Sequence, residues 1–284
     1  MQTQIALRVF TDHPKGGNPC LVTLNADNFS EAQMKEIAAN FGHECAFLFK
    51  ADPEENCDFS LRFFLPLEET EMCGHATLAT LWALKDQGRI SAGNYRIGTK
   101  SGVVDARIGT DGSLAFSQPN VFSETLDPEK KSRILSSLKI TENELANGEI
   151  INACTSRMKT LVPLQSTMIL NSLSPDFDQV KEICMEIGST GLYPYCRSEQ
   201  DTMFHARQFP RSAGYPEDAA TGIAASALAG VLKQTGVINS HRRITVLQGE
   251  AMGNPSRLDV DFEESTEGGT GYWILGQCIK IGET

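Results

Sequence analysis

The chain repeats itself loosely, and this internal repeat constrains its fold more than any other feature. GHATLATLWALKDQG, which starts at Gly74, matches GIAASALAGVLKQTG, which starts at Gly222, at an offset of 148 residues (222 minus 74). QMKEI at 33–37 recurs as QVKEI at 179–183, an offset of 146 (179 minus 33). Further matches in the same order are Gly42 with Gly188 and Arg62-Phe63-Phe64 with Arg207-Gln208-Phe209. The order predicts two similar halves, and two long copies exclude a solenoid.

The periodicity of apolar residues indicates the same elements in both halves. It predicts four helices, at 30–41, 74–87, 176–187 and 222–235. Ser30 is the expected N-cap of the first helix, and Gly88 is expected to close the second. Strand-like segments outnumber the helices and include IALRVF, ECAFLF, FSLRFFL, RITVLQG and GYWILGQCIKI. The predicted fold class is α+β, with two pseudo-symmetric halves that each wrap a curled sheet around one central apolar helix.

A length of 284 residues suits two domains of ordinary size. We predict an N-terminal half over 1–118, joined by the C-terminal strand 272–284, and a C-terminal half over 119–271. The helix at 74–87 is too apolar for a surface position, and we expect it to be buried nearly all round.

Charge and cysteine content narrow the class of partner. A formal net charge of -11 argues against nucleic acid and against anionic membrane surfaces, because both require basic patches. No window reaches the roughly 18 apolar residues of a membrane span, and we expect a cytoplasmic protein. The eight cysteines form no CxxC pair, which favours reduced thiols over disulfides or structural zinc.

The starts of the two apolar helices, Gly74 and Gly222, are candidate anion sites. If the halves pack face to face, both helix N-termini point at one cleft, where free N–H groups and the helix dipole favour a carboxylate. Glycine at each start would let a ligand approach closely. The alternative, in which water or a loop caps each helix start, stays open.

Ionisable groups beside these starts differ between the halves. Cys73 and His75 flank the first glycine, whereas Thr221 precedes the second. Glu44 lies in FGHECAFLF, an apolar strand opening in which a charge is costly unless it is paired or functional. Its repeat partner is Thr190, so the second half has no matching carboxylate. Glu44 is either a proton-transfer group or an edge-strand residue in water.

Five ordered stretches resemble the PhzF family of phenazine-biosynthesis-like proteins, which share the diaminopimelate epimerase fold. They are VFTDHPKGGNPCLVTL at 9–24, GHECAFL at 42–48, RFFLPLEETEMCGHATLATLWAL at 62–84, ARQFPRSAGYPEDAATGIAASALAG at 206–230 and QGEAMGNPSRLDV at 248–260. The resemblance covers the whole chain. It implies two similar halves with the active site between them, and it implies a homodimer.

The resemblance also implies an activity and its residues. Family members isomerise trans-2,3-dihydro-3-hydroxyanthranilate by moving a proton, with no metal or cofactor. Glu44 takes the place of the proton-transfer residue, and His75 and Asp218 take places beside the substrate. We therefore predict a small carboxylate-bearing substrate. We expect further substrate contacts at Gly74, Cys73, Gly222, Thr221 and Asn18.

The chain departs from the family pattern at the second helix start. EDPATGS is EDAATGI here, so Ala219 replaces a proline and Ile223 replaces a small hydroxyl residue. Asn254 stands in GNPS where the family has arginine. An apolar side chain at a substrate-facing position leaves the particular substrate open.

Two other functions remain as alternatives. Epimerase and racemase relatives use two cysteines, but Thr221 cannot act as a thiolate base, so Cys73 would need Glu44 or Asp218 as its partner. Ile223 also makes a non-catalytic ligand-binding protein on the same fold conceivable. A metal site at residues 43–45 is disfavoured because adjacent strand side chains alternate in direction. A Cys73–His75 hydrolase is disfavoured because the chain shows no third, orienting group.

Overall fold

The computed structural model describes residues 4–51, 56–238, 243–264 and 270–282. The chain forms two compact units, of which the first comprises residues 1–117 with 275–284 and the second comprises residues 118–274. Both combine strands with a smaller number of helices, which confirms the predicted α+β class. No helix within the described residues is long and apolar enough to cross a membrane.

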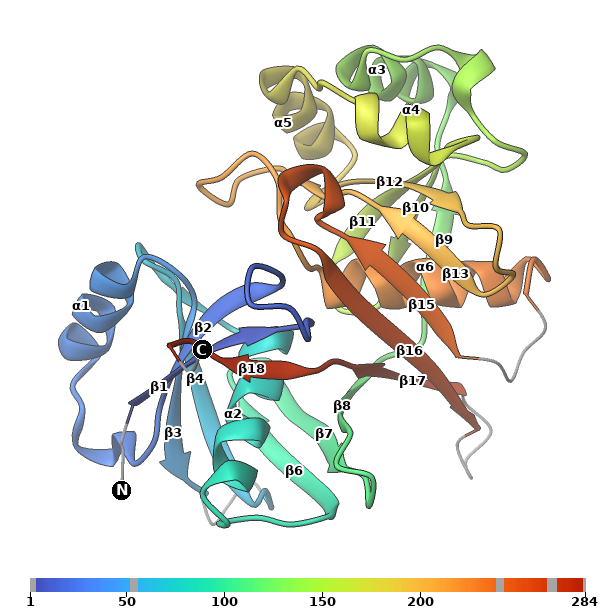
Figure 1. Cartoon of the computed structure of the whole chain (residues 1–284). Helices are drawn as coiled ribbons and strands as arrows, with labels where there is room; N and C mark the ends of the chain where they lie inside the picture. The colour runs from blue at the N-terminus through green and yellow to red at the C-terminus, as the bar shows by residue number, and fades with distance from the viewer. Residues whose placement is uncertain (1–3, 52–55, 239–242, 265–269, 283–284) are drawn as a thin grey trace. The chain divides into compact units, whose positions relative to one another are not determined.

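The first unit is a sheet that packs against helix α2 (Gly74–Asp86). Its strands are β1 (Gln4–Val9), β2 (Asn18–Thr23), β3 (Cys45–Lys50), β4 (Phe59–Phe64), β5 (Glu69–Thr70), β6 (Gly93–Thr99), β7 (Gly102–Ile108), β8 (Leu114–Gln118) and β18 (Cys278–Lys280). They pair in the order β18, β1, β2, β3, β4, β6, β7, β8, with parallel pairing at β2–β3 and β4–β6 and antiparallel pairing elsewhere. α2 contacts β1, β2, β3 and β18 (Figure 1).

Local sequence explains both helices of the first unit. Ser30 caps α1 (Glu31–Phe41) by accepting a hydrogen bond from the Gln33 amide. The Gln33 side-chain oxygen in turn accepts a hydrogen bond from the Ser30 amide, which completes a capping box. Gly88 follows the end of α2, and its φ of 66° lies in the left-handed region that favours glycine. Every α2 residue from His75 to Leu84 except Trp82 is buried. The expected caps and the expected burial of this helix are thus confirmed.

The second unit repeats this pattern around helix α6 (Gly222–Gln234). Its strands are β9 (Phe122–Thr125), β10 (Ile151–Cys154), β11 (Met158–Pro163), β12 (Gly191–Arg197), β13 (Met203–Ala206), β14 (Phe209–Pro210), β15 (Ile244–Gln248), β16 (Ser256–Glu264) and β17 (Thr270–Leu275). From β10 to β16 the successive pairings are antiparallel, parallel, antiparallel, parallel and antiparallel. The first unit has the same succession from β1 to β7. This shared order supports an origin by duplication.

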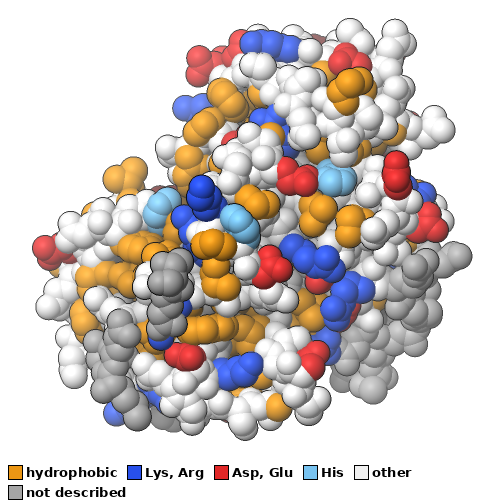
Figure 2. Space-filling view, in the orientation of Figure 1, with side chains coloured by type: hydrophobic (Ala, Val, Ile, Leu, Met, Phe, Trp, Pro, Cys, Tyr) orange, Lys and Arg blue, Asp and Glu red, His pale blue; other side chains and the backbone are white. Residues whose placement is uncertain are grey.

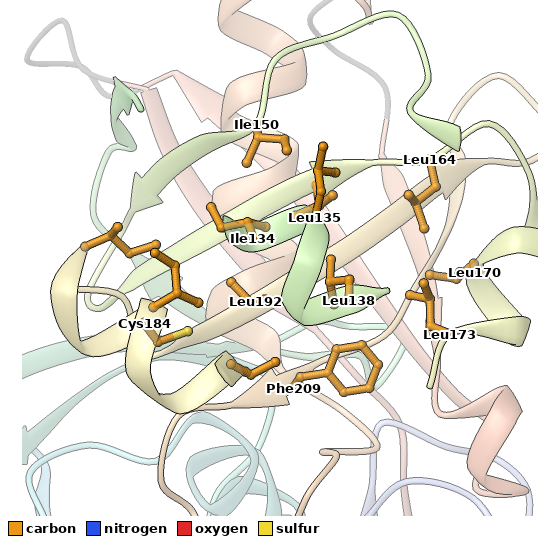
Figure 3. Close-up of a cluster of buried hydrophobic side chains, with 14 of the residues drawn as sticks. Ile134, Leu135, Leu138, Ile150, Leu164, Leu170, Leu173, Cys184, Leu192 and Phe209 are labelled. Carbon is orange, nitrogen blue, oxygen red and sulfur yellow. The ribbon is translucent and has the colours of Figure 1, made fainter. Parts of the chain in front are cut away.

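Three helices cover the other face of the second sheet: α3 (Pro128–Leu138), α4 (Thr167–Ser172) and α5 (Phe177–Glu186). Their apolar side chains form a buried cluster with β11 and β12, in which Ile134, Leu138 and Leu192 are fully buried (Figure 3). The predicted helix at 176–187 is confirmed as α5, which Asp176 caps. α3 and α4 are not among the four helices that the sequence predicts.

An arginine clamp occurs at the same place in both units. Arg62 binds Glu69 through two hydrogen bonds of 2.7 and 2.9 Å, and its guanidinium lies over Phe64. Arg207 binds Glu217 through bonds of 2.9 and 2.7 Å and lies over Phe209. Bidentate pairing and stacking hold each guanidinium in one orientation. The clamp explains by structure why the pattern Arg-x-Phe occurs in both halves of the sequence.

The prediction of one continuous strand over GYWILGQCIKI is wrong. The structure divides it into β17 and β18 at Gly276 and Gln277. The carbonyl of Gln277 accepts hydrogen bonds from the amides of Phe10 and Thr11, and the backbone at Gly276 lies against the Phe10 ring. These contacts turn the chain between the two strands.

The state of the cysteines and the distribution of surface charge can both be compared with the expectations from composition. All eight cysteines are free, as predicted. On the face drawn in Figure 2, lysine and arginine side chains are interspersed with acidic and uncharged ones.

Candidate functional site

Glu44 lies at the entry to β3 in the first unit. Gly42 ends α1 in the left-handed region, with a φ of 76°, and turns the chain toward the strand. The carbonyl of Glu44 accepts a hydrogen bond of 3.3 Å from the Leu21 amide, which ties its backbone to β2. Its side chain is only 15% exposed. Glu44 is therefore not the water-exposed edge residue that the sequence left as an alternative.

His75 faces this carboxylate from the first turn of α2. Its Nε2 lies 3.9 Å from Oε2 of Glu44, and its side chain is 10% exposed. This separation is too long for a direct hydrogen bond but short enough for both groups to contact one small polar group. The structure thus brings together two of the predicted catalytic residues.

Cys73 lies beside the same imidazole. Its Sγ is 3.5 Å from Nδ1 and 3.7 Å from Nε2 of His75. Because these nitrogens point in different directions from the ring, a sulfur almost equidistant from both is aligned with neither. This geometry does not match a thiol that donates its proton to the imidazole, which further disfavours a cysteine hydrolase.

Two other thiols in this unit are poor candidate bases. Burial raises the pKa of Cys45 to about 12, although a backbone hydrogen bond opposes the shift. Burial also raises the pKa of Cys20 well above its ordinary value, with smaller contributions from Cys73, Cys45 and Glu44. Both remain protonated at neutral pH.

Gly74 has a packing role that the sequence did not reveal. A Cβ added at this position would lie 2.4 Å from Cζ of Phe116. The aromatic ring therefore occupies the space that a side chain would need. Close approach of a ring accounts for this glycine without any ligand.

The starts of α2 and α6 share a further property. Ser30, Asp127, Ser166 and Asp176 each cap a helix through a side-chain hydrogen bond. At Cys73 of α2 and Thr221 of α6, no such side-chain cap is found among the described residues. The two central helices thus differ from the four outer ones in how their first N–H groups are satisfied.

In the second unit, a buried network holds Asp218 against the start of α6. Thr221 donates its hydroxyl proton to Asp218 at 2.5 Å. Gln248 donates to the Asp218 carbonyl at 2.7 Å and to the Thr221 hydroxyl at 3.1 Å, and it accepts from the Thr221 amide at 3.2 Å. Tyr193 donates to the same Gln248 oxygen at 3.0 Å. These bonds fix the backbone and the carboxylate of Asp218.

Gln248 and Tyr193 are not among the site residues that the sequence predicts. Gln248 does begin the matched stretch QGEAMGNPS, so that stretch was the available signal. Glu217, next to Asp218, belongs to the arginine clamp and is structural. Asn18 is the first residue of β2 and pairs with Val9. Ile223 is half-buried in the first turn of α6.

A metal site was not expected at these residues. Within the described ranges, no group of three or more histidine, cysteine, aspartate or glutamate side chains is arranged to hold a metal ion.

The paired curled sheets with apolar central helices define an α+β protein of the epimerase-like class, which includes the proline racemase and diaminopimelate epimerase folds. The chain belongs to the phenazine biosynthesis-like family, whose PhzC-PhzF model matches residues 7–283. The resemblance found in the sequence is therefore confirmed.

Curated relatives of the chain are isomerases. It is 29% identical to the uncharacterized isomerase YfhB of Bacillus subtilis, over 90% of this chain and 89% of the relative. It is 31% identical to the uncharacterized isomerase YddE of Escherichia coli K12, over 88% and 86%. It is 28% identical to trans-2,3-dihydro-3-hydroxyanthranilate isomerase of Pseudomonas fluorescens, over 99% and 98%. The predicted class of enzyme, an isomerase, is confirmed.

Solved structures share the fold. A PhzF-family phenazine biosynthesis protein of Bacillus anthracis superposes with a TM-score of 0.88 at 24% identity, covering 99% of this chain and 98% of the other. A hydroxyproline epimerase of Agrobacterium vitis superposes with a TM-score of 0.63 at 13% identity, covering 98% and 90%. At these identities the likeness concerns the fold alone.

Proposed function

We propose that this isomerase moves a proton along a small cyclic or conjugated carboxylic acid without a cofactor, and that Glu44 carries the proton. A substrate like trans-2,3-dihydro-3-hydroxyanthranilate is favoured by the relative that bears this name. The observation that carries the proposal is the approach of Glu44 to His75, 3.9 Å between Oε2 and Nε2, with both side chains largely withdrawn from water.

The chemistry follows from what each group can do. The Glu44 carboxylate removes a proton from a carbon next to the conjugated system, and the electron pair moves into that system. His75 donates to, or accepts from, a hydroxyl or amine of the substrate. The N–H groups at the start of α2 stabilise developing negative charge, and preorganised donors of this kind contribute about 3 kcal/mol each. Glu44 then returns the proton to another carbon.

In the second unit, Asp218 is the proposed contact for a substrate amine or hydroxyl. One of its oxygens accepts from Thr221 and the other from the Ala220 amide at 3.4 Å. These donors hold the carboxylate in one orientation, in which it can accept a hydrogen bond from a substrate amine or hydroxyl.

Incubation in D2O, followed by NMR, tests the proposal. Trans-2,3-dihydro-3-hydroxyanthranilate and a panel of cyclic carboxylic and amino acids are the probes. We expect deuterium at a ring or vinylogous carbon with the wild type, and a loss of at least 10³-fold with Glu44→Gln, since the amide cannot accept the proton. Glu36→Gln, an exposed glutamate on α1, is the matched control and should retain full activity. Equal turnover by wild type and Glu44→Gln would refute the mechanism.

Cofactor independence has its own measurement. Protein treated with EDTA and dialysed should retain its full rate of deuterium incorporation. A loss that Mg²⁺, Mn²⁺ or Zn²⁺ restores would contradict the proposal.

An amino-acid epimerase is the second candidate, because Cys73 lies within 3.7 Å of both nitrogens of His75, whose Nε2 lies 3.9 Å from Glu44. This reaction would place deuterium at the α-carbon of an amino or imino acid. Cys73→Ser should then abolish the exchange. Under the leading proposal, the same variant keeps at least a tenth of the wild-type rate on the ring substrate.

A further inference from the structure

Lys159 is a buried cation in the second unit with no role in the reaction described above. Its side chain is 5% exposed. On β11, Thr160 bonds to Asn152 and Val162 enters the cluster beneath α3, α4 and α5. Because strand side chains alternate, Lys159 points to the opposite face, where α6 packs on β11. Within the described residues, no hydrogen bond or ion pair is found at its Nζ.

Gln208 is a second buried polar residue on this face. It is 1% exposed, and neither Nε2 nor Oε1 has a hydrogen-bond partner among the described residues. Its neighbour Phe209 packs into the cluster on the far face, so the Gln208 side chain points toward α6. In the first unit, the matching position is the apolar Phe63, which is 1% exposed. A buried unpaired amide costs about 1–3 kcal/mol, which an apolar residue avoids.

Lys159 and Gln208 both lie next to Gly191. Thr160 pairs with Leu192 in the parallel β11–β12 ladder, so Lys159 lies one step back, beside Gly191. A Cβ on Gly191 would lie 2.1 Å from Nε2 of Gln208, so the amide occupies the space above this glycine. The glycine therefore allows the amide to lie next to the lysine position.

The same face carries the candidate substrate contact. Gln208 forms an isolated β-bridge with Asp218, whose amide donates to the Gln208 carbonyl at 3.0 Å. The oxygens of Asp218 already accept from Thr221 and Ala220. Lys159 and Gln208 thus add donors beside an acid that has its own partners.

The charges around Lys159 leave it a cation at neutral pH. Burial lowers the pKa of its ammonium group to about 8, and the negative charge of Asp218 opposes that shift. Arg157 and Arg211 act in the same direction as burial, and Cys184 acts against it. A cation with little exposure and no bonded anion is stabilised strongly by any anion that reaches it.

We propose that Lys159 and the amide of Gln208 bind a second anionic group of the substrate, so that this enzyme acts on a cyclic acid with two acidic groups. The proposal rests on the proposed function, since it specifies the substrate of that same reaction. It assigns the first carboxylate to the start of α6 and the second acidic group to the Lys159–Gln208 pair in the same unit.

Calorimetric titration of the full chain with four aromatic acids tests this assignment. The probes are benzoate, with one carboxylate, and phthalate, isophthalate and terephthalate, with two at different spacings. We expect at least one dicarboxylate to bind the wild type about tenfold or more tighter than benzoate, which is the range for a hydrogen bond to a charged group. Lys159→Met should abolish that preference and leave benzoate binding within twofold.

Two further variants separate binding from folding. Gln208→Leu fills the same volume without an amide, and we expect it to reduce the preference for the dicarboxylate several-fold. Lys181→Met removes an exposed lysine on α5 and should change nothing. The inference is overturned if no dicarboxylate binds tighter than benzoate, if none of the four acids binds, or if Lys159→Met keeps the preference.

The outcome is distinguishable from a failure of the proposed function. If Glu44→Gln stops deuterium incorporation while no dicarboxylate preference is found, only the assignment of Lys159 and Gln208 fails. If the preference is found but Glu44→Gln leaves turnover unchanged, the anion site stands and the proton-transfer mechanism fails.

Discussion

Gly74 shows how one residue can have two explanations. From the sequence, a glycine between Cys73 and His75 suggested space for a ligand at a helix start. In the structure, the ring of Phe116 fills that space. The packing explanation needs no ligand, so it can be tested by stability alone.

We predict that Gly74→Ala lowers the free energy of unfolding of the first unit by about 1–3 kcal/mol, because its Cβ would clash with the Phe116 ring. Phe116→Leu shortens the neighbour, and combining the two substitutions should recover part of the loss. Urea unfolding of the four proteins in a double-mutant cycle measures the coupling. Strictly additive effects would mean that the ring does not limit this position.

At Lys159, burial links the stability of the protein directly to pH. Its native pKa of about 8 lies below the ordinary value of 10.5. Between these values the unfolded chain binds more protons than the native chain, so the contribution of this residue to stability rises with pH. Its destabilising effect is complete below pH 8 and is gone above about pH 10.5.

Lys159→Met should therefore raise the free energy of unfolding at pH 7 by on the order of 2 kcal/mol. The gain should shrink steadily as the pH rises from 8 to 10.5. Unfolding curves of the variant and the wild type across this range give the difference, in which the titration of other groups cancels. Lys181→Met is the control and should show no such trend. A gain that does not depend on pH would mean that burial leaves the pKa of Lys159 at its ordinary value.

At the scale of elements, the arginine clamps connect segments that are distant in the chain. Arg207 is buried, and its Nη1 also donates to the carbonyls of Leu170 and Leu173 at the end of α4. The Arg62 side chain is 35% exposed and pairs with Glu69 and Glu31. The arginine of the clamp is thus more exposed to water in the first unit than in the second.

We predict that Arg207→Met destabilises the second unit by about 3–5 kcal/mol, because it leaves the buried Glu217 carboxylate unpaired. Arg62→Met is the matched variant in the first unit and should cost about 1 kcal/mol or less, since Arg62 is partly exposed to water and its partner Glu69 keeps Lys100 at 3.0 Å. Chemical denaturation of both variants measures the contrast. Similar losses for the two would show that exposure does not govern the clamp.

Elements were predictable where their signals are local. Ser30, the spacing of α1 and the apolar run of α2 all lie within one short window, and the structure confirms them. GYWILGQCIKI reads as one strand, and only the bonds of Gln277 to Phe10 and Thr11 divide it. The division depends on residues more than 260 positions away (277 minus 10).

At the scale of the whole molecule, the C-terminal strand completes the first unit. β18 pairs with β1, and the Ile281 amide donates to the Ala6 carbonyl at 2.9 Å. Gly276 lies against Phe10 and Leu78, two buried residues. β18 thus stabilises β1 by pairing with it.

Truncation after Leu275 should therefore destabilise the first unit selectively. We expect faster amide hydrogen exchange in β1 and α2, while α3 and α5 of the second unit exchange at the wild-type rate. Mass spectrometry of peptides from both units measures this, and truncation after Ile281, which keeps β18, is the control. Equal acceleration in both units would show that β18 stabilises the chain as a whole.

The sequence by itself determined the α+β class, the two apolar central helices and membership of the phenazine biosynthesis-like family. These depend on local periodicity, on cap residues and on ordered motifs, all of which can be read along the chain. Only the tertiary structure decided that Glu44 approaches His75, that Gln248 holds Asp218, and that Lys159 is a buried cation beside an unpaired amide. Burial and hydrogen bonding depend on which distant segments pack together, and no local pattern encodes that.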